Sequence, residues 1–324
     1  MPNNKKPNNS VMTLNEVKDL YATKQIGKAD FIDKMHDLHM SLFEYTFLIK
    51  ETDISKITIE DDKLLMTSRA TPYHAGGISF YCDLLDKRAA PFETFNFGTY
   101  ESGDSALIYK IVEPDYTVFD VGGNIGWYAN HIAPLLTNGT IYSFEPIPET
   151  FKKLQKNVEL NGYKNIVLEN FAFSDKEDKI KFFYSPTMTA AASSANITEN
   201  NQMQELECIT NTVDNYVSTN NIKKVDFIKC DVEGAEFMVF KGAKQTIQKY
   251  KPIVFSEILR KWAAKFNYHP NDIINFYKDM GYHCFVARNY GLVYFDYVND
   301  NTVETNFFFL HPEVHKEKIN KLLI

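Results

Sequence analysis

Long apolar runs and patterned cysteines are both absent from this chain of 324 residues. No stretch approaches the roughly 18 consecutive apolar residues that predict a membrane-spanning helix, so we expect no membrane span. The polar residues 1–10 lack the apolar segment of a secretory signal. The four cysteines form no C-x-x-C pair, which argues against a disulfide framework or a zinc ribbon. We therefore expect reduced thiols and a cytoplasmic protein.

Glycine, proline and arginine are also scarce. The chain has 14 Gly and 12 Pro, below the usual shares of about 7% and about 5%, which excludes a collagen-like or broadly disordered protein. Only four residues are Arg, and acidic residues outnumber basic ones by 42 to 35, giving a net charge of −7. Because non-specific nucleic-acid binders are normally basic, we expect no nucleic-acid partner.

The patterns along the chain predict an N-terminal extension followed by an α/β domain. Residues 1–12 have the composition of a disordered tail, 29–51 have helical spacing, and 57–66 alternate like a hairpin. From Tyr116 onward, strand and helix patterns alternate, which is typical of a doubly wound, mostly parallel sheet. The predicted division is a tail at 1–12, a helical and hairpin extension at 13–95, and a second domain at 96–324. The extension would serve substrate binding or homo-oligomer formation.

The elements of the second domain are predicted from these patterns. Strands are expected at 117–121, 140–144, 166–173, 225–230, 252–257, 283–287 and 306–310. Helices are expected at 125–136, 151–161, 235–248 and 271–280.

A glycine-rich turn follows the first of these strands, in the run Asp120-Val-Gly-Gly-Asn-Ile-Gly126. Its glycines, Gly122, Gly123 and Gly126, do not have the G-x-G-x-x-G spacing that admits a dinucleotide pyrophosphate. An NAD-dependent dehydrogenase is therefore excluded. The acid Asp120 would repel a pyrophosphate but suits an ammonium group, such as that of S-adenosylmethionine (SAM).

Two more groups of acids follow later strands. Glu145, 25 residues after Asp120, is placed to accept the ribose hydroxyls of an adenosine, and residues 170–175 would border the adenine. After the strand at 225–230 come three acids, and another closes the strand at 252–257: Asp231, Glu233, Glu236 and Glu257. An acceptor hydroxyl bound there would lose its proton to a carboxylate. For Glu233 and Glu236, a structural role at a helix start is as good an interpretation.

These motifs, together with Phe144-Glu-Pro146, Lys241-Gly-Ala243 and Lys251-Pro-Ile-Val-Phe-Ser-Glu257, resemble the FkbM family of SAM-dependent methyltransferases over residues 97–310. One departure is Gly123, where Ala is more usual; its effect should be only a looser loop. The resemblance implies a seven-stranded class I methyltransferase sheet with an antiparallel last strand at 306–310. It also implies methylation of a hydroxyl on a sugar or natural product.

The resulting site hypothesis divides the residues between cofactor and chemistry. The cofactor-binding set is Glu101, Asp120, Gly122, Gly123, Asn124, Gly126, Glu145, Pro146, Asn170, Ala172 and Asp231. Asp231 is the first candidate for the general base and Glu257 the second, with His131 and His74 behind them. Alternatively, Asp231 and Glu257 hold Mg²⁺ or another hard divalent ion.

Several alternatives remain at this stage. A nucleic-acid amino-methyltransferase would show an Asn/Asp-Pro-Pro-aromatic turn where this chain has Asp231-Val-Glu-Gly234. A non-catalytic module with a methyltransferase-like fold is the main rival. Trp127 and Tyr128 are expected to pack in the core rather than against a ligand. His36 and His39 are expected to be solvated, and residues 187–201 to form a lid or a tolerant loop.

Overall fold

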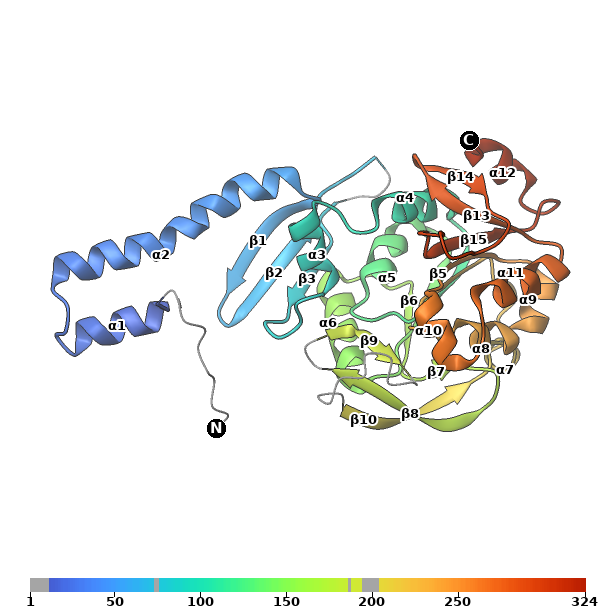
Figure 1. Cartoon of the computed structure of the whole chain (residues 1–324), viewed down its shortest axis with the longest axis horizontal. Helices are drawn as coiled ribbons and strands as arrows, with labels where there is room; N and C mark the ends of the chain where they lie inside the picture. Colours follow the sequence, from blue (N-terminus) through green and yellow to red (C-terminus); the bar gives the residue numbers. More distant parts are fainter. Residues whose placement is uncertain (1–11, 73–75, 186–187, 194–203) are drawn as a thin grey trace. The chain divides into compact units, whose positions relative to one another are not determined.

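The computed structural model describes residues 12–72, 76–185, 188–193 and 204–324 (Figure 1). The expected tail, His74 and most of the expected lid at 187–201 lie outside or largely outside these ranges. The chain divides into two compact units between Glu51 and Thr52. Each unit is described separately.

The first unit is helical. It contains α1 (Leu14–Ala22), α2 (Lys28–Leu48) and the 3-10 turn η1 (Ile49–Glu51). The Thr13 side chain accepts a bond from the Glu16 backbone, and the Glu16 carboxylate accepts one from Thr13, which fixes the start of α1. The 21 residues of α2 include no buried side chain. Among the described helices, none combines the length and apolar composition needed to cross a bilayer.

The second unit begins with a small antiparallel sheet of β1 (Ile54–Glu60), β2 (Lys63–Ser68) and β3 (Ser79–Cys82). The hairpin expected at 57–66 is confirmed, with Glu60 paired to Lys63. The backbone N–H groups of Ser79 and Tyr81 donate to the side chains of Asn161 and Asn157, at 2.8 and 3.0 Å. These bonds attach the small sheet to the α/β fold, and both lie in the second compact unit.

The large sheet has the order β14-β13-β15-β12-β11-β4-β5-β6. Its strands are β4 (Thr117–Val121), β5 (Thr140–Phe144), β6 (Ile166–Glu169), β11 (Phe227–Cys230), β12 (Ile253–Glu257), β13 (His283–Arg288), β14 (Gly291–Tyr294) and β15 (Asn306–Leu310). β15 lies antiparallel between β12 and β13. The expected doubly wound sheet with an antiparallel last strand is therefore confirmed, and β14 adds an eighth strand through a hairpin with β13 that the sequence analysis missed.

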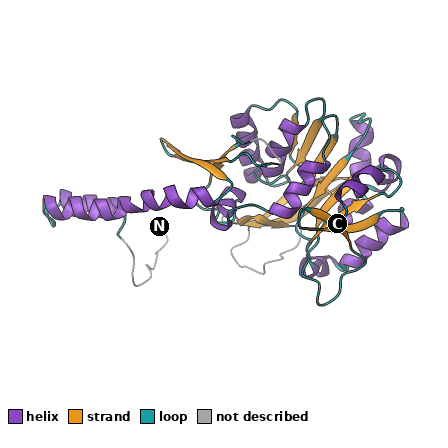
Figure 2. Ribbon diagram, turned by 90° about the horizontal axis from the view of Figure 1, so that it is seen from above, coloured by secondary structure: helices purple, strands orange, loops and turns teal. Residues whose placement is uncertain are grey.

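Helices cover both faces of this sheet (Figure 2). They are α3 (Ala90–Phe97), α4 (Ser102–Ile111), α5 (Trp127–Ile132), η2 (Ala133–Leu135), α6 (Pro148–Asn161), α7 (Val213–Thr219), α8 (Glu236–Lys241), α9 (Lys244–Tyr250), α10 (Arg260–Ala263), η3 (Ala264–Phe266), α11 (Pro270–Asp279) and α12 (Lys316–Leu322).

Alternate residues of each central strand enter different cores, as expected for a sheet buried on both faces. Phe307 and Phe309 join the core beneath α7, α8, α9 and α11. Phe308 and Leu310 join the opposite core, with residues of α4, α5 and α12. The run Asn306-Phe-Phe-Phe-Leu310 is apolar throughout for this reason.

Two predicted elements are wrong as single units. The strand expected at 166–173 divides because Asn170 turns the chain: its side-chain amide donates to the carbonyls of Glu145 and Pro146. The residues after it form β7 (Ala172–Phe173) in a second sheet of order β7-β10-β8-β9, with β8 (Asp178–Ser185), β9 (Met188–Ser193) and β10 (Gln204–Asn211). The helix expected at 235–248 divides into α8 and α9, because Asp214 accepts bonds from the Gln245 and Thr246 N–H groups and starts a new helix there.

Candidate functional site

A cavity of about 580 Å³ lies at the carboxyl ends of β12, β11, β4 and β5. These are four adjacent strands of the large sheet, and the chain order reverses between β11 and β4. Ligand sites of open α/β sheets form at such a reversal, outside the carboxyl ends of the strands. All residues that line the cavity belong to the second unit.

The glycine loop after β4 packs against backbone on both sides. Gly122 and Gly123 donate their N–H groups to the Phe144 carbonyl at 3.1 and 2.9 Å. Gly122 has a φ of +84°, and a Cβ there would lie 1.9 Å from the Asp231 carbonyl oxygen. A Cβ on Gly123 would lie 2.2 Å from Ser143 Oγ. Glycine at 123 thus leaves the space that the Ser143 side chain occupies. The expectation that it merely loosens the loop is wrong.

Asp120 lies beneath this loop and does not line the cavity. It is fully buried, accepts a bond from Ser143 Oγ at 2.8 Å, and lies 3.5 Å from the Lys229 ammonium. Burial raises its pKa, while Lys229 and Ser143 oppose that shift. The charge predicted to meet a ligand ammonium is therefore already met by a lysine of the protein.

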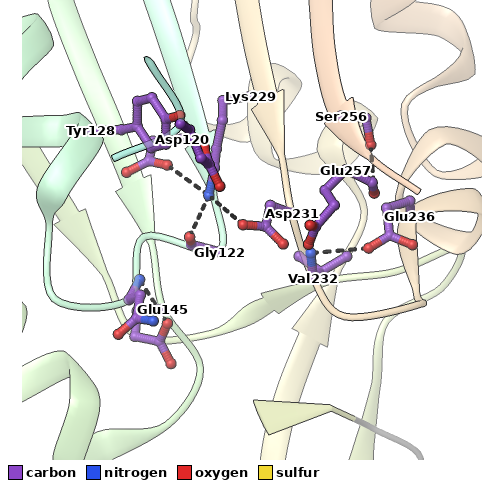
Figure 3. Close-up of polar contacts among 12 residues, drawn as sticks. Asp120, Gly122, Tyr128, Glu145, Lys229, Asp231, Val232, Glu236, Ser256 and Glu257 are labelled. Carbon is purple, nitrogen blue, oxygen red and sulfur yellow. Dashed lines mark hydrogen bonds and ion pairs between the residues drawn. The ribbon is translucent and has the colours of Figure 1, made fainter. Parts of the chain in front are cut away.

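Lys229 is a functional candidate that the sequence analysis missed. Its ammonium donates to the Gly122 carbonyl at 2.8 Å and lies 3.5 Å from both Asp120 and Asp231 (Figure 3). The side chain is only 4% exposed, and the neighbouring carboxylates keep its pKa above the ordinary value despite the burial. A lysine among the otherwise apolar residues of β11 was the available signal.

Glu145 follows β5 and lines the cavity. One carboxylate oxygen accepts the Asn124 N–H and the other the Ile147 N–H, each at 3.0 Å. Each oxygen of a carboxylate has two lone-pair sites, so both can accept a further hydrogen bond. Burial raises the pKa of Glu145 to about 7, against the effect of these two bonds.

The other members of the predicted cofactor set fall into two groups. Asn124, Pro146 and Ala172 line the cavity, whereas Gly126 and Asn170 do not. Gly126, with φ at +86°, precedes α5, and Asn170 supports the chain after β5 through its bonds to Glu145 and Pro146. Both therefore shape the loops that carry the lining residues.

An apolar wall stands beside Glu145. Side chains of β7, β8 and α8, together with that of the residue before β7, form it: Phe171, Phe173, Ile180, Phe182 and Met238. Phe171 and Phe173 meet edge to face, with ring centroids 5.3 Å apart. Such a wall suits a flat heteroaromatic ring. The sequence predicts the adenine near 170–175, whereas the part of β8 in the same wall is seen only in the structure.

Glu101 enters the cavity from the turn before α4, in a left-handed conformation with φ 45° and ψ 46°. The Tyr128 hydroxyl donates to its carboxylate. Burial raises the pKa of Glu101 to about 7, and the bond from Tyr128 opposes the shift. Trp127 and Tyr128 are buried, as expected, but both also line the cavity.

Three carboxylates meet at the far side of the cavity. Asp231, Glu233 and Glu257 each have an oxygen within 4.8 Å of the others, and no other such group occurs among the described residues. Burial and then the charge of Asp231 raise the pKa of Glu257 to about 9. Burial likewise raises the pKa of Glu233 well above its ordinary value. Hard divalent ions take such oxygen ligands, so the donor set fits one.

Glu236 holds the loop that carries these acids. One of its oxygens accepts the N–H groups of Val232 and Gly234 at 3.1 and 3.0 Å, and the other accepts the Tyr268 hydroxyl at 3.0 Å. Figure 3 shows its carboxylate against this loop, away from Lys229. Of the two interpretations left open for Glu236, the geometry supports the structural one.

The remaining histidine candidate among the described residues is remote from this chemistry. His131 is buried, its Nδ1 lies 2.8 Å from the Trp127 carbonyl oxygen, and it does not line the cavity.

Comparison with known proteins relates the chain to methyltransferases. Residues 120–284 match the model of the methyltransferase FkbM domain. The hexuronic acid methyltransferase AglP of Haloferax volcanii is 27% identical over 46% of this chain and 58% of its own length. The 2-O-methyltransferase NoeI of Sinorhizobium fredii is 26% identical over 44% of this chain and 63% of its own length. The chain thus covers less than two thirds of either relative.

A curated fungal relative and a crystal structure were also found. Methyltransferase 1 of Beauveria bassiana is 26% identical over 40% of this chain and 58% of its own length. The crystal structure of methyltransferase FkbM from Methylobacillus flagellatus has a TM-score of 0.39 and 14% identity, over 61% of this chain and 44% of that one.

Proposed function

Because this chain belongs to the FkbM methyltransferase family, whose domain model matches residues 120–284, we propose that it transfers the methyl group of SAM to a hydroxyl of a sugar. One observation carries the proposal: Glu145, the glycine loop and the carboxylates Asp231 and Glu257 all line one cavity. The names of two relatives, a hexuronic acid methyltransferase and a 2-O-methyltransferase, support a saccharide acceptor over other small molecules.

The cavity suits SAM in shape and in chemistry. Gly122 and Gly123 pack so closely on backbone and on Ser143 that neither has room for a Cβ, so this part of the cavity is lined by backbone. The two oxygens of Glu145 would accept the ribose hydroxyls, and the wall of Phe171, Phe173 and Phe182 would hold the adenine. Glu101 replaces Asp120 as the carboxylate for the ammonium, because Asp120 is held by Lys229. When bound, SAM supplies a methyl group already activated on a sulfonium sulfur.

The chain's own residues would orient the acceptor and take its proton. Glu257, with its pKa raised to about 9, holds a proton at neutral pH. Asp231 is then left as the acceptor for the proton of the hydroxyl, beside the positive charge of Lys229 at 3.5 Å. Alignment of the reacting oxygen supplies much of the rate enhancement, and a positioned base adds about 10²- to 10⁴-fold.

The same carboxylates offer a second role, as ligands of Mg²⁺ or a similar ion. Their oxygens lie within 4.8 Å of one another. An ion there would lower the pKa of a bound hydroxyl. Transfer of label from SAM to an acceptor, with and without EDTA, separates this role from that of a metal-free base.

The first experiment is calorimetric titration with S-adenosylhomocysteine (SAH) of the wild type, Glu145→Ala and Glu149→Ala. Glu149 is the control, because it is exposed on α6 and does not line the cavity. We expect micromolar binding by the wild type and the control, and a loss of about 100-fold in Glu145→Ala, since two hydrogen bonds to a charged group are removed. Absence of SAH binding to folded wild-type protein would overturn the proposal and leave a non-catalytic assembly module as the better interpretation.

A further inference from the structure

Three basic side chains line the cavity among the described residues: Arg88, Lys229 and Lys261. Lys229 is buried and already engaged by Gly122, Asp120 and Asp231. Arg88 and Lys261 are different because their side chains reach solvent; that of Arg88 is 60% exposed. The proposed mechanism uses neither of them.

Two acidic neighbours bind Arg88, one through its side chain and one through its backbone. Its Nε–H donates to Glu93 at 2.7 Å, and its backbone N–H donates to Asp86 at 3.1 Å. The Glu93 carboxylate, and more weakly that of Glu233, raises the pKa of Arg88. A guanidinium has five N–H donors, so the groups on its two terminal nitrogens remain for a ligand. This side chain is therefore oriented near the loop of Asp231–Gly234.

Trp262 also lies near this loop. It belongs to α10, just beyond the strand that ends in Glu257, and its half-buried ring lines the cavity. The Trp262 carbonyl would lie 3.1 Å from a Cβ on Gly234, so this helix is fixed directly against the acid loop. The Lys261 ammonium lies 5.6 Å from the centre of the Trp262 ring. We define Arg88, Lys261 and Trp262 as the basic rim.

Charge argues that this rim serves the acceptor. SAM carries a net positive charge, so exposed cations do not favour its binding as a whole. An acceptor that bears a carboxylate gains a charge-assisted bond from Arg88, and a sugar ring has an apolar face that packs on an indole.

We infer that the basic rim is an acceptor subsite for an acidic sugar, with Trp262 beneath the ring and Arg88 on the carboxylate. This inference rests on the proposed function and narrows its acceptor class to uronic acids. Neither the sulfonium nor the adenosine of the cofactor is assigned to the rim. The inference can therefore fail while SAH binding remains intact.

The test compares 4-nitrophenyl β-D-glucuronide with the neutral 4-nitrophenyl β-D-glucoside. Both are titrated into the wild-type protein saturated with SAH, and both are offered as acceptors with labelled SAM. The variants are Arg88→Gln, Trp262→Leu and Trp262→Phe, each also titrated with SAH alone. Arg260→Gln is the matched control, because Arg260 lies on the same helix, bonds to Asn299 and Asp300, and does not line the cavity.

We expect the wild type and Arg260→Gln to prefer the glucuronide by about 10- to 100-fold, the effect of one charge-assisted bond. Arg88→Gln should abolish that preference with SAH affinity unchanged. Trp262→Leu should weaken both sugars, and Trp262→Phe should restore most of the loss. The inference is overturned if the wild type binds SAH but does not prefer the glucuronide. It is also overturned if Arg88→Gln weakens SAH binding, because the rim would then hold the carboxylate of the cofactor.

Discussion

The two walls of the cavity are built in different ways. On the proposed cofactor wall, Gly122 and Gly123 pack so closely that neither has room for a Cβ, and two backbone N–H groups hold the Glu145 carboxylate. On the proposed acceptor wall, Arg88 and Lys261 are exposed side chains, and the Arg88 side chain donates to Glu93. A rigid wall suits a ligand that never changes, whereas an exposed wall can be altered for each acceptor without loss of the fold. Substitutions on the first wall should therefore lower the unfolding free energy or the affinity for the cofactor. Substitutions on the second wall should change only the acceptor preference.

The largest expected effect is on the rigid wall, from Gly122→Ala. Both Gly122 and Gly162 have positive φ, but a Cβ on Gly122 meets the Asp231 carbonyl at 1.9 Å, whereas one on Gly162 meets nothing within 4 Å. We expect Gly162→Ala to cost about 1 kcal/mol of unfolding free energy, and Gly122→Ala to cost at least about 3 kcal/mol. Urea denaturation of both variants measures the difference. Equal losses of unfolding free energy in the two variants would show that the glycine loop after β4 is not closely packed.

Substitution of the acids between the walls should affect the chemical step alone. We expect Asp231→Asn to lower kcat by about 10²- to 10⁴-fold, as for loss of a general base, with SAH affinity within about threefold of the wild type. Glu257→Gln should cost less, because Glu257 is already protonated at neutral pH by virtue of its raised pKa. Single-turnover rates and SAH titrations of both variants give the two quantities. A larger loss of kcat in Glu257→Gln than in Asp231→Asn would indicate that Glu257, and not Asp231, is the general base.

The pH dependence of SAH binding tests the acids assigned to the cofactor, and its expected effect is smaller. Burial raises the pKa of Glu145 and of Glu101 to about 7, and both must be ionised to accept the hydroxyls and the ammonium. Affinity should therefore rise with pH and level off above about 7. For one such group, a fall from pH 8 to pH 6 should weaken binding by about tenfold. Titrations across this range should show a shallower dependence for Glu145→Gln. An unchanged dependence would exclude Glu145 as its source.

The smallest expected effect is that of removing residues 1–51. No described residue of that unit lines the cavity, so we expect SAH affinity to stay within about twofold of the wild type. The exposed apolar side chains of α2, which include Phe43 and Phe47, make oligomer formation the property to measure beside it. Ultracentrifugation of the full chain and the truncated chain tests that role of the predicted N-terminal extension. A large loss of SAH binding would instead place the unit within the cofactor site.

Site residues that belong to short local motifs can be predicted from the sequence, whereas those contributed by distant segments cannot. The motifs at 120–126, 145–146 and 231–236 are local patterns at strand ends, and parallel strands bring their carboxyl ends together. Arg88, Phe182 and Trp262 belong to no such pattern, and they line the cavity only because the turn before α3, strand β8 and helix α10 return to the same edge. Asp120 was placed at the right strand end but assigned the wrong neighbour, because the ion pair with Lys229 crosses from β4 to β11.

The alternation of strands and helices, the glycine turn and the order in which acids follow the strands can all be read from the unfolded chain. These depend on local periodicity and on residues whose backbone conformation is limited, which a linear pattern displays. Three features follow from the folded chain instead: which charges neutralise each other, where Asn170 and Asp214 interrupt an element, and which exposed side chains complete the cavity. The physical reason is that ion pairs, buried hydrogen bonds and cavity walls join residues far apart in the chain, and their energies depend on distances that no local pattern fixes.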